Sequence, residues 1–325
     1  FRLDAVHTIN GDREPYKDNL PDPNFTLGPL PQDKQPFFRQ LHDVAQLNQP
    51  VIQEFSKAYR KIAKEYDGDR FLMGEVSGDD GKAMLVSQTF TEPGRLHATY
   101  NFDLLEHGGL TVSEMKEAIS NAIELFNGTG KLSFAFSNHD VPRSASRQLS
   151  PLGITLDKQD DLQFLLLQLE TSLIGSCCIY QGEELGLSDV TNIQFDKMKD
   201  PWGLNFYPEF LGRDTCRTPM VWEKNKPMGG FTSANESWLP ISELHMEKAG
   251  LDMAKSEGSI YNKFSSFLKW RRKQPAMISS NKMSELFGGP SEIIFDRESE
   301  TQILRCKFDF ELVKATFEEV TYGTS

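Results

Sequence analysis

The sequence predicts an α/β protein in which parallel strands alternate with helices, followed by a small antiparallel β unit. Short apolar segments have the length of buried strands, at residues 1–6, 71–76, 97–104, 132–138 and 177–181. Amphipathic stretches, with apolar residues three and four apart, lie at residues 51–66, 112–126, 161–174 and 260–272. Strands that alternate with such helices form parallel βαβ units, so a doubly wound sheet and a (β/α) barrel both fit the pattern.

Three local features refine this outline. Thr111 is placed to cap the helix that follows it, with Glu114 three residues further on, the spacing of a capping box. Residues 187–247 are rich in Pro, Gly and aromatic residues and have little periodicity, and a loop of this length is usually functional. From about Ile278, short alternating segments such as 292–296 and 302–308 predict the antiparallel unit.

The composition excludes several classes of function. The formal net charge of the 325 residues is −12, so we expect no nucleic acid partner, because phosphate backbones bind concentrated basic surfaces. The short basic cluster at residues 269–273 has the position of a helix C-terminus. No stretch reaches the ~18 apolar residues that a membrane span needs, so no membrane partner is evident.

The cysteines and the start of the chain bear on the cellular context. Four cysteines do not make a disulfide framework in a chain this long, so we expect Cys177, Cys178, Cys216 and Cys306 to be buried, reduced thiols. Such thiols favour a cytoplasmic protein. The chain begins with Phe1 rather than Met, and we expect further sequence upstream, which leaves the presence of a signal peptide or an upstream domain open.

Three of the expected strands end in a carboxylate. The segments are Phe1-Arg2-Leu3-Asp4, Phe71-Leu72-Met73-Gly74-Glu75 and Phe136-Ser137-Asn138-His139-Asp140. The C-terminal ends of parallel strands gather at one face, so these side chains are expected to converge. Each acid has a structural alternative: Asp4 could pair with Arg2, Glu75 could be a surface residue, and Asp140 could cap a helix. Three such acids together favour a catalytic site.

The surrounding residues carry a family resemblance. The Phe1–Ala5, Gly74–Val76 and Phe136–Asp140 segments resemble, in order and spacing, three signature regions of the α-amylase family of glycoside hydrolases. The run Tyr180–Gly186 is similar to the eighth strand of that family's barrel and the turn after it. The segments 200–202, 212–214 and 216–222 resemble the long loop after this strand in bacterial α-glucosidases of the maltase and oligo-1,6-glucosidase type. The resemblance covers residues 1 to about 275.

The resemblance implies a definite architecture. Residues 1–275 would form strands four to eight of a partial TIM (β/α)8 barrel, with 187–247 as the long loop after the last strand. Residues 276–325 would form a small C-terminal antiparallel β domain, and whether its last strands are complete stays open. The first three barrel strands and the family's usual cation site would lie outside this chain, so no metal site and no cofactor are expected in it. Whether the chain folds and acts without those strands stays open.

Carried over position by position, the resemblance also implies roles for the side chains. Asp4 would be the nucleophile, Glu75 the general acid/base, and Asp140 the residue that holds the sugar hydroxyls and stabilises the transition state. Arg2 would keep Asp4 ionised, since a close cation lowers a carboxylate pKa. His139 would donate to a glucose hydroxyl. Arg213 and Arg217 would line the sugar site, with a structural alternative in which a buried Arg fixes the loop through Asp214.

The expected function is therefore that of a retaining α-glucosidase. It would release glucose from the non-reducing end of short α-glucosides such as maltose, sucrose or isomaltose by double displacement. One alternative is a transglucosylase or sugar isomerase that uses the same covalent intermediate, and another is a non-catalytic protein like the transporter heavy subunits. A small oligosaccharide is the expected partner, while linkage preference and oligomeric state are left open.

Overall fold

The computed structural model describes residues 1–6, 50–76, 83–126, 131–280 and 282–321. Its first layer is a parallel sheet whose strands lie side by side in the order in which they occur along the chain. Each strand is hydrogen-bonded in parallel to the next one along the chain. The strands are β1 (Arg2–Leu3), β2 (Met73–Gly74), β3 (Ala98–Tyr100), β4 (Leu132–Phe134) and β5 (Ser176–Cys177).

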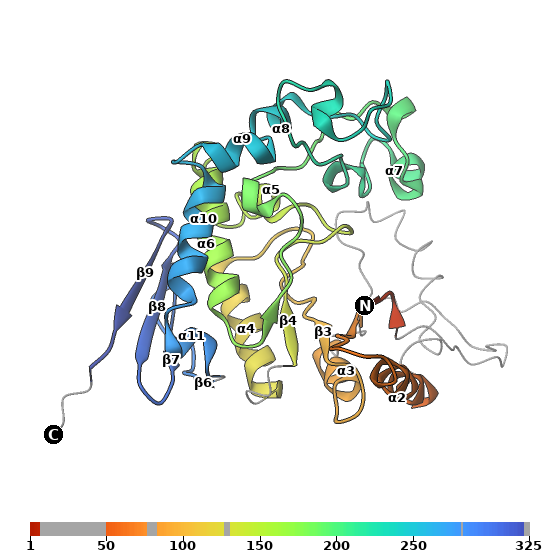
Figure 1. The fold of residues 1–325 in the computed structure, drawn as a ribbon. Helices are drawn as coiled ribbons and strands as arrows, with labels where there is room; N and C mark the ends of the chain where they lie inside the picture. The colour runs from red at the N-terminus through yellow and green to blue at the C-terminus, as the bar shows by residue number, and fades with distance from the viewer. Residues whose placement is uncertain (7–49, 77–82, 127–130, 281, 322–325) are drawn as a thin grey trace.

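Helices connect these strands and lie together on one side of the sheet (Figure 1). Parallel crossovers are almost always right-handed, so a sheet built in sequential order keeps its helices on one face. A doubly wound sheet reverses its strand order and has helices on both faces, and the described strands show no such reversal. The connecting helices are α2 (Pro50–Lys64), α3 (Ala83–Phe90), α4 (Val112–Phe126), α5 (Ser144–Arg147), η3 (Leu156–Lys158) and α6 (Gln159–Ser172).

The capping box predicted for α4 is present. The Glu114 carboxylate accepts hydrogen bonds from the Thr111 amide and hydroxyl, both at 2.7 Å, and the Glu114 amide donates to Thr111 Oγ1 at 3.3 Å. This satisfies donors that the first turn of a helix leaves unpaired.

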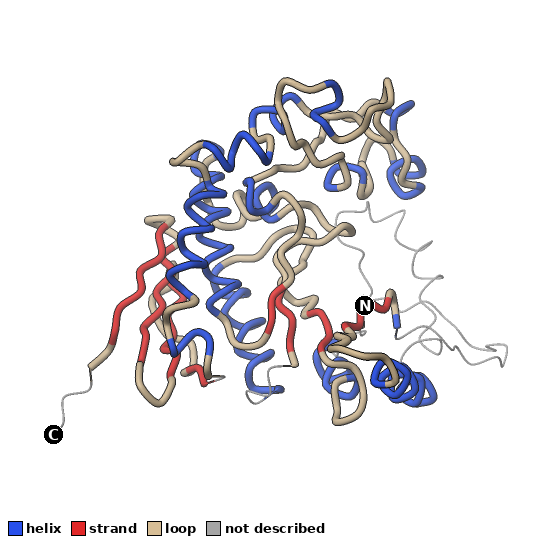
Figure 2. Tube along the Cα trace, viewed as in Figure 1, coloured by secondary structure: helices blue, strands red, loops and turns tan. Residues whose placement is uncertain are grey.

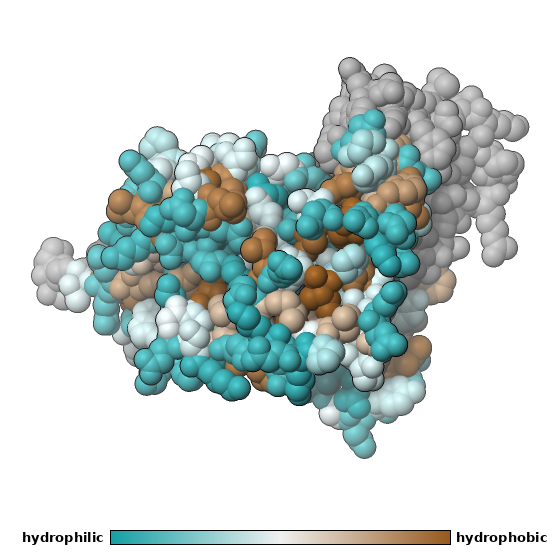
Figure 3. Space-filling model, turned by 90° about the horizontal axis from the view of Figure 1, so that it is seen from above, coloured by the Kyte–Doolittle hydropathy of each residue, from teal (hydrophilic) through white to brown (hydrophobic). Residues whose placement is uncertain are grey.

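Beyond β5 the chain forms short helical turns joined by irregular segments, which lie above the strand ends in the view of Figure 1. From above, the molecule shows hydrophilic and apolar patches intermixed (Figure 3). A longer helix then returns along α6. These elements are η4 (Glu183–Leu185), η5 (Phe195–Lys197), α7 (Pro201–Phe206), η6 (Asp214–Cys216), η7 (Pro227–Gly230), α8 (Glu243–Glu247), α9 (Gly250–Lys255), α10 (Ile260–Arg271) and α11 (Pro275–Ile278).

The C-terminal part of the chain forms an antiparallel sheet on the far side of α6 and α10 from the parallel strands (Figure 2). Its strands, in spatial order, are β6 (Lys282–Met283), β7 (Glu292–Glu298), β8 (Ile303–Asp309) and β9 (Lys314–Glu319). Buried side chains of the two sheets belong to one hydrophobic cluster, which includes Phe134 of β4, Leu166 of α6 and Phe295 and Phe308 of the antiparallel sheet. The two sheets therefore share a core, and the boundary between residues 275 and 276 stays a prediction.

One expectation about the cysteines was wrong. The four thiols are free, and Cys216 and Cys306 are buried, but Cys177 is exposed and Cys178 is only partly buried. Cys177 lies on β5, which within the described sheet pairs only with β4 and so has an open edge. An edge strand leaves more of its surface accessible than a central one.

Candidate active site

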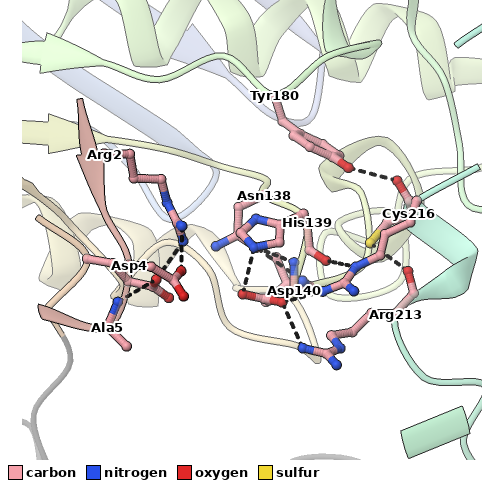
Figure 4. Close-up of polar contacts among 12 residues, drawn as sticks. Arg2, Asp4, Ala5, Asn138, His139, Asp140, Tyr180, Arg213 and Cys216 are labelled. Atoms are coloured by element: carbon pink, nitrogen blue, oxygen red, sulfur yellow. Dashed lines mark hydrogen bonds and ion pairs between the residues drawn. The ribbon is translucent and has the colours of Figure 1, made fainter. Parts of the chain in front are cut away.

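The strand-end acids lie at the same edge of the parallel sheet. Asp4 follows β1, Glu75 follows β2 directly, and Asp140 lies in the segment after β4. Figure 4 shows Arg2 and Asp4 next to the group formed by His139, Asp140 and Arg213. The sheet thus brings together the acids Asp4 and Asp140, which are 136 positions apart in the sequence.

Arg2 links the first two carboxylates. Its Nη1 lies 2.5 Å from Asp4 Oδ1 and its Nη2 lies 2.5 Å from Glu75 Oε2. These contacts bear on the structural alternative of each acid. Asp4 does pair with Arg2, but the same guanidinium also holds Glu75, whose side chain is only 15% exposed and so is not an ordinary surface residue. The two carboxyl groups therefore share one guanidinium as their partner.

The environments of these acids shift their pKa values in opposite directions. Hydrogen bonds from Arg2 and from Glu75 lower the pKa of Asp4. Burial raises the pKa of Glu75, and the nearby Asp4 adds to this, although the Ala5 amide and Arg2 oppose it. Opposed shifts in neighbouring carboxyl groups are the pattern that separates an ionised nucleophile from a protonated acid.

The backbone around these acids has specific requirements. At Gly74, just before Glu75, an added Cβ would lie 2.5 Å from Leu96 Cδ1, so a larger residue there would require the Leu96 side chain to move. Ala5, just after Asp4, has a left-handed φ of 38°, uncommon for a residue with a Cβ. In this conformation its amide donates to Glu75 Oε2 at 3.2 Å. Strained backbone of this kind tends to occur where function requires it.

The Asp140 carboxylate is held by three side chains. Arg217 Nη2 lies 2.6 Å and Arg213 Nη1 3.2 Å from its Oδ1, and His139 Nε2 lies 3.3 Å from its Oδ2. Burial lowers the pKa of His139 more than Asp140 raises it, which favours a neutral imidazole at pH 7. Asn138 Oδ1 accepts from the Asp140 amide at 2.8 Å and so fixes the turn.

Two structural alternatives proposed for this part of the site are wrong. Asp140 does not cap α5, whose N-cap residue is Arg143. Arg213 does not pair with Asp214. Its guanidinium binds Asp200 instead, with Nη2 2.7 Å from Oδ1 and Nε 3.1 Å from Oδ2. The Asp214 carboxylate instead accepts hydrogen bonds from the main-chain amides of Lys199 and Asp200, earlier in the same loop.

Four contributors to the site were not found from the sequence. They are the Asn138 turn, the Ala5 amide, the Asp200 partner of Arg213, and Tyr100, whose ring lies 5.8 Å from the Arg2 guanidinium carbon. Only Asn138 had a usable signal, since an Asn two residues before a key Asp is a common turn-former. Within the described residues, no group of three or more His, Cys, Asp or Glu side chains is placed to hold a metal ion.

Comparison with known proteins shows the family to which the chain belongs. The model of the alpha-amylase catalytic domain matches residues 1–280. The chain belongs to the alpha-amylase family. Family membership agrees with the position of the acids, since barrels of this kind carry their active sites at the C-terminal ends of the strands.

Individual alpha-amylase family relatives are also similar to the chain. It is 36% identical over 282 residues to a protein named "Probable alpha-glucosidase" from Rhizobium meliloti, covering 85% of this chain and 48% of that protein. It is 25% identical over 342 residues to an oligo-1,6-glucosidase of Halalkalibacterium halodurans, covering 95% and 56%. The chain spans about half the length of these curated relatives.

Solved structures of family members superpose well on the chain. The alpha-glucosyl transfer enzyme XgtA matches with a TM-score of 0.79 and 29% identity, over 95% of this chain and 55% of that one. The trehalose-6-phosphate hydrolase of Bacillus licheniformis matches with a TM-score of 0.73 at 19% identity, over 95% and 56%, a likeness of fold alone. Among the described helices of this alpha-amylase family chain, none has the length and apolar character of a membrane span.

Proposed function

We propose that this chain carries the catalytic carboxylates of a retaining α-glucosidase. The proposal rests on the Arg2 contact that joins Asp4 and Glu75, together with their opposed pKa shifts, since Arg2 lowers the pKa of Asp4 whereas burial raises that of Glu75. Retaining glycosidases use two carboxyl groups ~5–5.5 Å apart, and inverting ones leave a wider gap for water. Two carboxylates on one guanidinium suit the narrow arrangement. We further propose that the five parallel strands correspond to strands four to eight of a (β/α)8 barrel.

The first chemical step assigns one role to each acid. Asp4 attacks the anomeric carbon of the terminal glucose, and Glu75 gives its proton to the glycosidic oxygen as the bond to the leaving sugar breaks. The product is an ester between Asp4 and glucose. Arg2 stabilises the ionised form of Asp4 before the attack, and burial favours the protonated form of Glu75 by raising its pKa.

In the second step Glu75, now ionised, takes a proton from water as the water oxygen attacks the anomeric carbon. The ester bond breaks, Asp4 is released as a carboxylate, and glucose leaves with its original α configuration. Both transition states have positive charge on the sugar ring. The Asp140 carboxylate, oriented by Arg213 and Arg217, stabilises this charge and accepts from ring hydroxyls, and His139 donates to a neighbouring hydroxyl.

The proposed substrates are short α-glucosides of the maltose, sucrose or isomaltose type. The similarity to relatives named alpha-glucosidase and oligo-1,6-glucosidase supports this class. The likeness to an alpha-glucosyl transfer enzyme favours one second candidate, transglucosylation, in which a sugar hydroxyl replaces water in the second step. That reaction uses the same residues.

Product analysis tests the proposal and separates the two candidates. The full-length protein is incubated with maltose, isomaltose and sucrose in turn, and products are followed by chromatography and by NMR of the first-formed anomer. Release of α-glucose supports hydrolysis with retention, and longer glucosides formed at high substrate concentration support transfer. The Asp4→Asn protein is the control, since it lacks the nucleophile. Release of β-glucose, or equal turnover by Asp4→Asn, would overturn the mechanism.

A further inference from the structure

The main-chain carbonyl of Cys216 receives two side-chain hydrogen bonds from distant parts of the chain. Arg143 Nη2 donates to it at 3.1 Å and the Tyr180 hydroxyl donates at 3.0 Å. Arg143 precedes α5, Tyr180 follows β5, and Cys216 ends η6 in the long loop. Figure 4 shows the Tyr180 hydroxyl pointing at this carbonyl. The oxygen is therefore fixed from two directions.

The residue after this carbonyl is Arg217, which acts on the candidate site directly. Its Nη2 donates to Asp140 Oδ1 at 2.6 Å, and its Nε donates to the His139 carbonyl, also at 2.6 Å. Only one peptide bond separates the clamped Cys216 oxygen from the Arg217 Cα, and peptide bonds are planar and stiff. The position of Arg217 therefore depends on where the Cys216 carbonyl is held.

Arg143 is buried, and several contacts fix the position of its side chain. The residue is 1% exposed, and its guanidinium carbon lies 4.8 Å from the Tyr180 ring centre. Its Nη1 donates to the Gln181 carbonyl at 2.7 Å. At Gly182, whose φ is 93°, an added Cβ would lie 2.9 Å from Arg143 Nη1, so the chain passes too closely for a side chain. Burying a guanidinium costs free energy unless it is hydrogen-bonded, and this one donates to the main-chain carbonyls of Gln181 and Cys216.

The contacts form a closed path through the site. Asp140 and Arg143 lie on the same short segment, Arg143 binds the Cys216 carbonyl, and Arg217 returns to Asp140. The geometry points to Arg143 and Tyr180 as positioning residues, which hold Arg217 against Asp140 through the Cys216 carbonyl without touching substrate themselves. This inference rests on the proposed function, because it assigns the path a catalytic consequence. If Asp140 holds the sugar more strongly in the transition state than in the bound substrate, loosening the path lowers kcat by a much larger factor than it raises KM.

Three variants of the full-length protein test the inference. Tyr180→Phe removes one donor to Cys216 and leaves the ring in place. Arg143→Lys keeps the charge but cannot reach both the Gln181 and Cys216 carbonyls. Arg297→Lys is the matched control. Arg297 lies on β7 of the antiparallel sheet, is 2% exposed and likewise donates to main-chain carbonyls, those of Ser172, Leu173 and Ser280.

We expect kcat to fall about tenfold in Tyr180→Phe and about a hundredfold in Arg143→Lys, with KM within about twofold, because small displacements in a catalytic group have effects of this size. Arg297→Lys should lose thermal stability and keep its kcat below its unfolding temperature. The inference is overturned if Tyr180→Phe keeps full kcat, or if Arg143→Lys loses no more kcat than Arg297→Lys at equal stability.

A structural measurement separates this inference from the proposed function. In crystals of Arg143→Lys, we expect the Arg217 Nη2–Asp140 Oδ1 distance, 2.6 Å in the unaltered protein, to exceed hydrogen-bonding range. A displaced Cys216 carbonyl with this contact unchanged would overturn the inference even in an active enzyme. A lengthened contact in a protein that hydrolyses no α-glucoside would support the positioning role and reject the proposed function.

Discussion

Arg2 Nη2 lies 2.5 Å from Glu75 Oε2, so the side chains at the ends of two neighbouring strands are in direct contact. The register pairs Arg2 with Met73, two residues before Glu75, which brings the Glu75 carboxylate within reach of the guanidinium. The other Nη of Arg2 holds Asp4. One cation thus contacts both acids on which the proposed chemistry depends.

The pH dependence of kcat/KM should be bell-shaped. The acid limb reports Asp4, which must be ionised, and its lowered pKa places that limb below the usual range of an Asp. The alkaline limb reports Glu75, which must be protonated, and its raised pKa places activity loss above the usual range of a Glu. Initial rates at low substrate concentration across the pH range measure both. An alkaline limb at or below pH ~4.3, the usual Glu value, would contradict this assignment.

Arg2→Gln should move both limbs to higher pH. The hydrogen bond from Arg2 is the largest cause of the lowered Asp4 pKa, and the Arg2 charge also opposes the raised Glu75 pKa. Without Arg2, both carboxyl groups bind their protons more tightly. The control is Arg272→Gln, which removes the same charge from an exposed position at the end of α10. If both variants shift the profile equally, the effect belongs to net charge and not to the Arg2 contact.

Glu75→Gln should abolish most turnover yet raise the melting temperature at neutral pH. Burial raises the pKa of Glu75 in the folded protein. The stability that the protonated Glu75 contributes is therefore fully present below its pKa in the unfolded chain, ~4.3, and is lost as the pH rises through its pKa in the folded protein. A neutral Gln does not lose stability in this way. The Glu75→Gln protein should therefore melt at a higher temperature than the unaltered protein above this pH range, and the difference should disappear below it. Melting temperatures of both proteins from acid to neutral pH test this. A lower melting temperature for Glu75→Gln at neutral pH would mean that the Arg2 ion pair outweighs the cost of burial.

The partner of Arg213 can be established by a double-mutant cycle. Asp200 has a fully buried side chain that accepts from both the amide and the guanidinium of Arg213. Arg213→Gln and Asp200→Asn should show a coupling energy of at least about 1 kcal/mol in urea unfolding, as directly bonded residues do. The matched cycle with Asp214→Asn should give a coupling near zero. The reverse result would reinstate Asp214 as the partner.

The sequence was informative where the local pattern and the global fold agree. Apolar runs located β1 to β5, and the acids at the ends of β1, β2 and β4 followed from them, because parallel strands point their C-terminal ends the same way. The strands β7 and β8 were found by alternation, but β6 was too short and β9, with the sequence Lys-Ala-Thr-Phe-Glu-Glu, is largely polar. In these two strands, pairing with a neighbour outweighs the weak local signal.

The long loop was recognised but its contacts were not. That Arg213 binds Asp200 and not the adjacent Asp214 depends on where the chain turns between α7 and η6, and no periodicity encodes such a turn. The role of the Cys216 carbonyl could not be predicted either, since every residue type has a main-chain carbonyl and the sequence does not show which one accepts a side-chain hydrogen bond. The left-handed φ of Ala5 was equally invisible, because alanine does not mark such a conformation as glycine does.

The central claim is that Asp4 is the nucleophile. The most direct measurement uses a fluorinated glucosyl fluoride that forms the covalent intermediate faster than water removes it. The full-length protein is incubated with this reagent, digested, and examined by tandem mass spectrometry. Our account predicts one added fluoroglucosyl unit, carried by the peptide that contains Asp4, and no label in Asp4→Asn. A label on Glu75 or Asp140, or hydrolysis of the reagent with no covalent adduct, would contradict it.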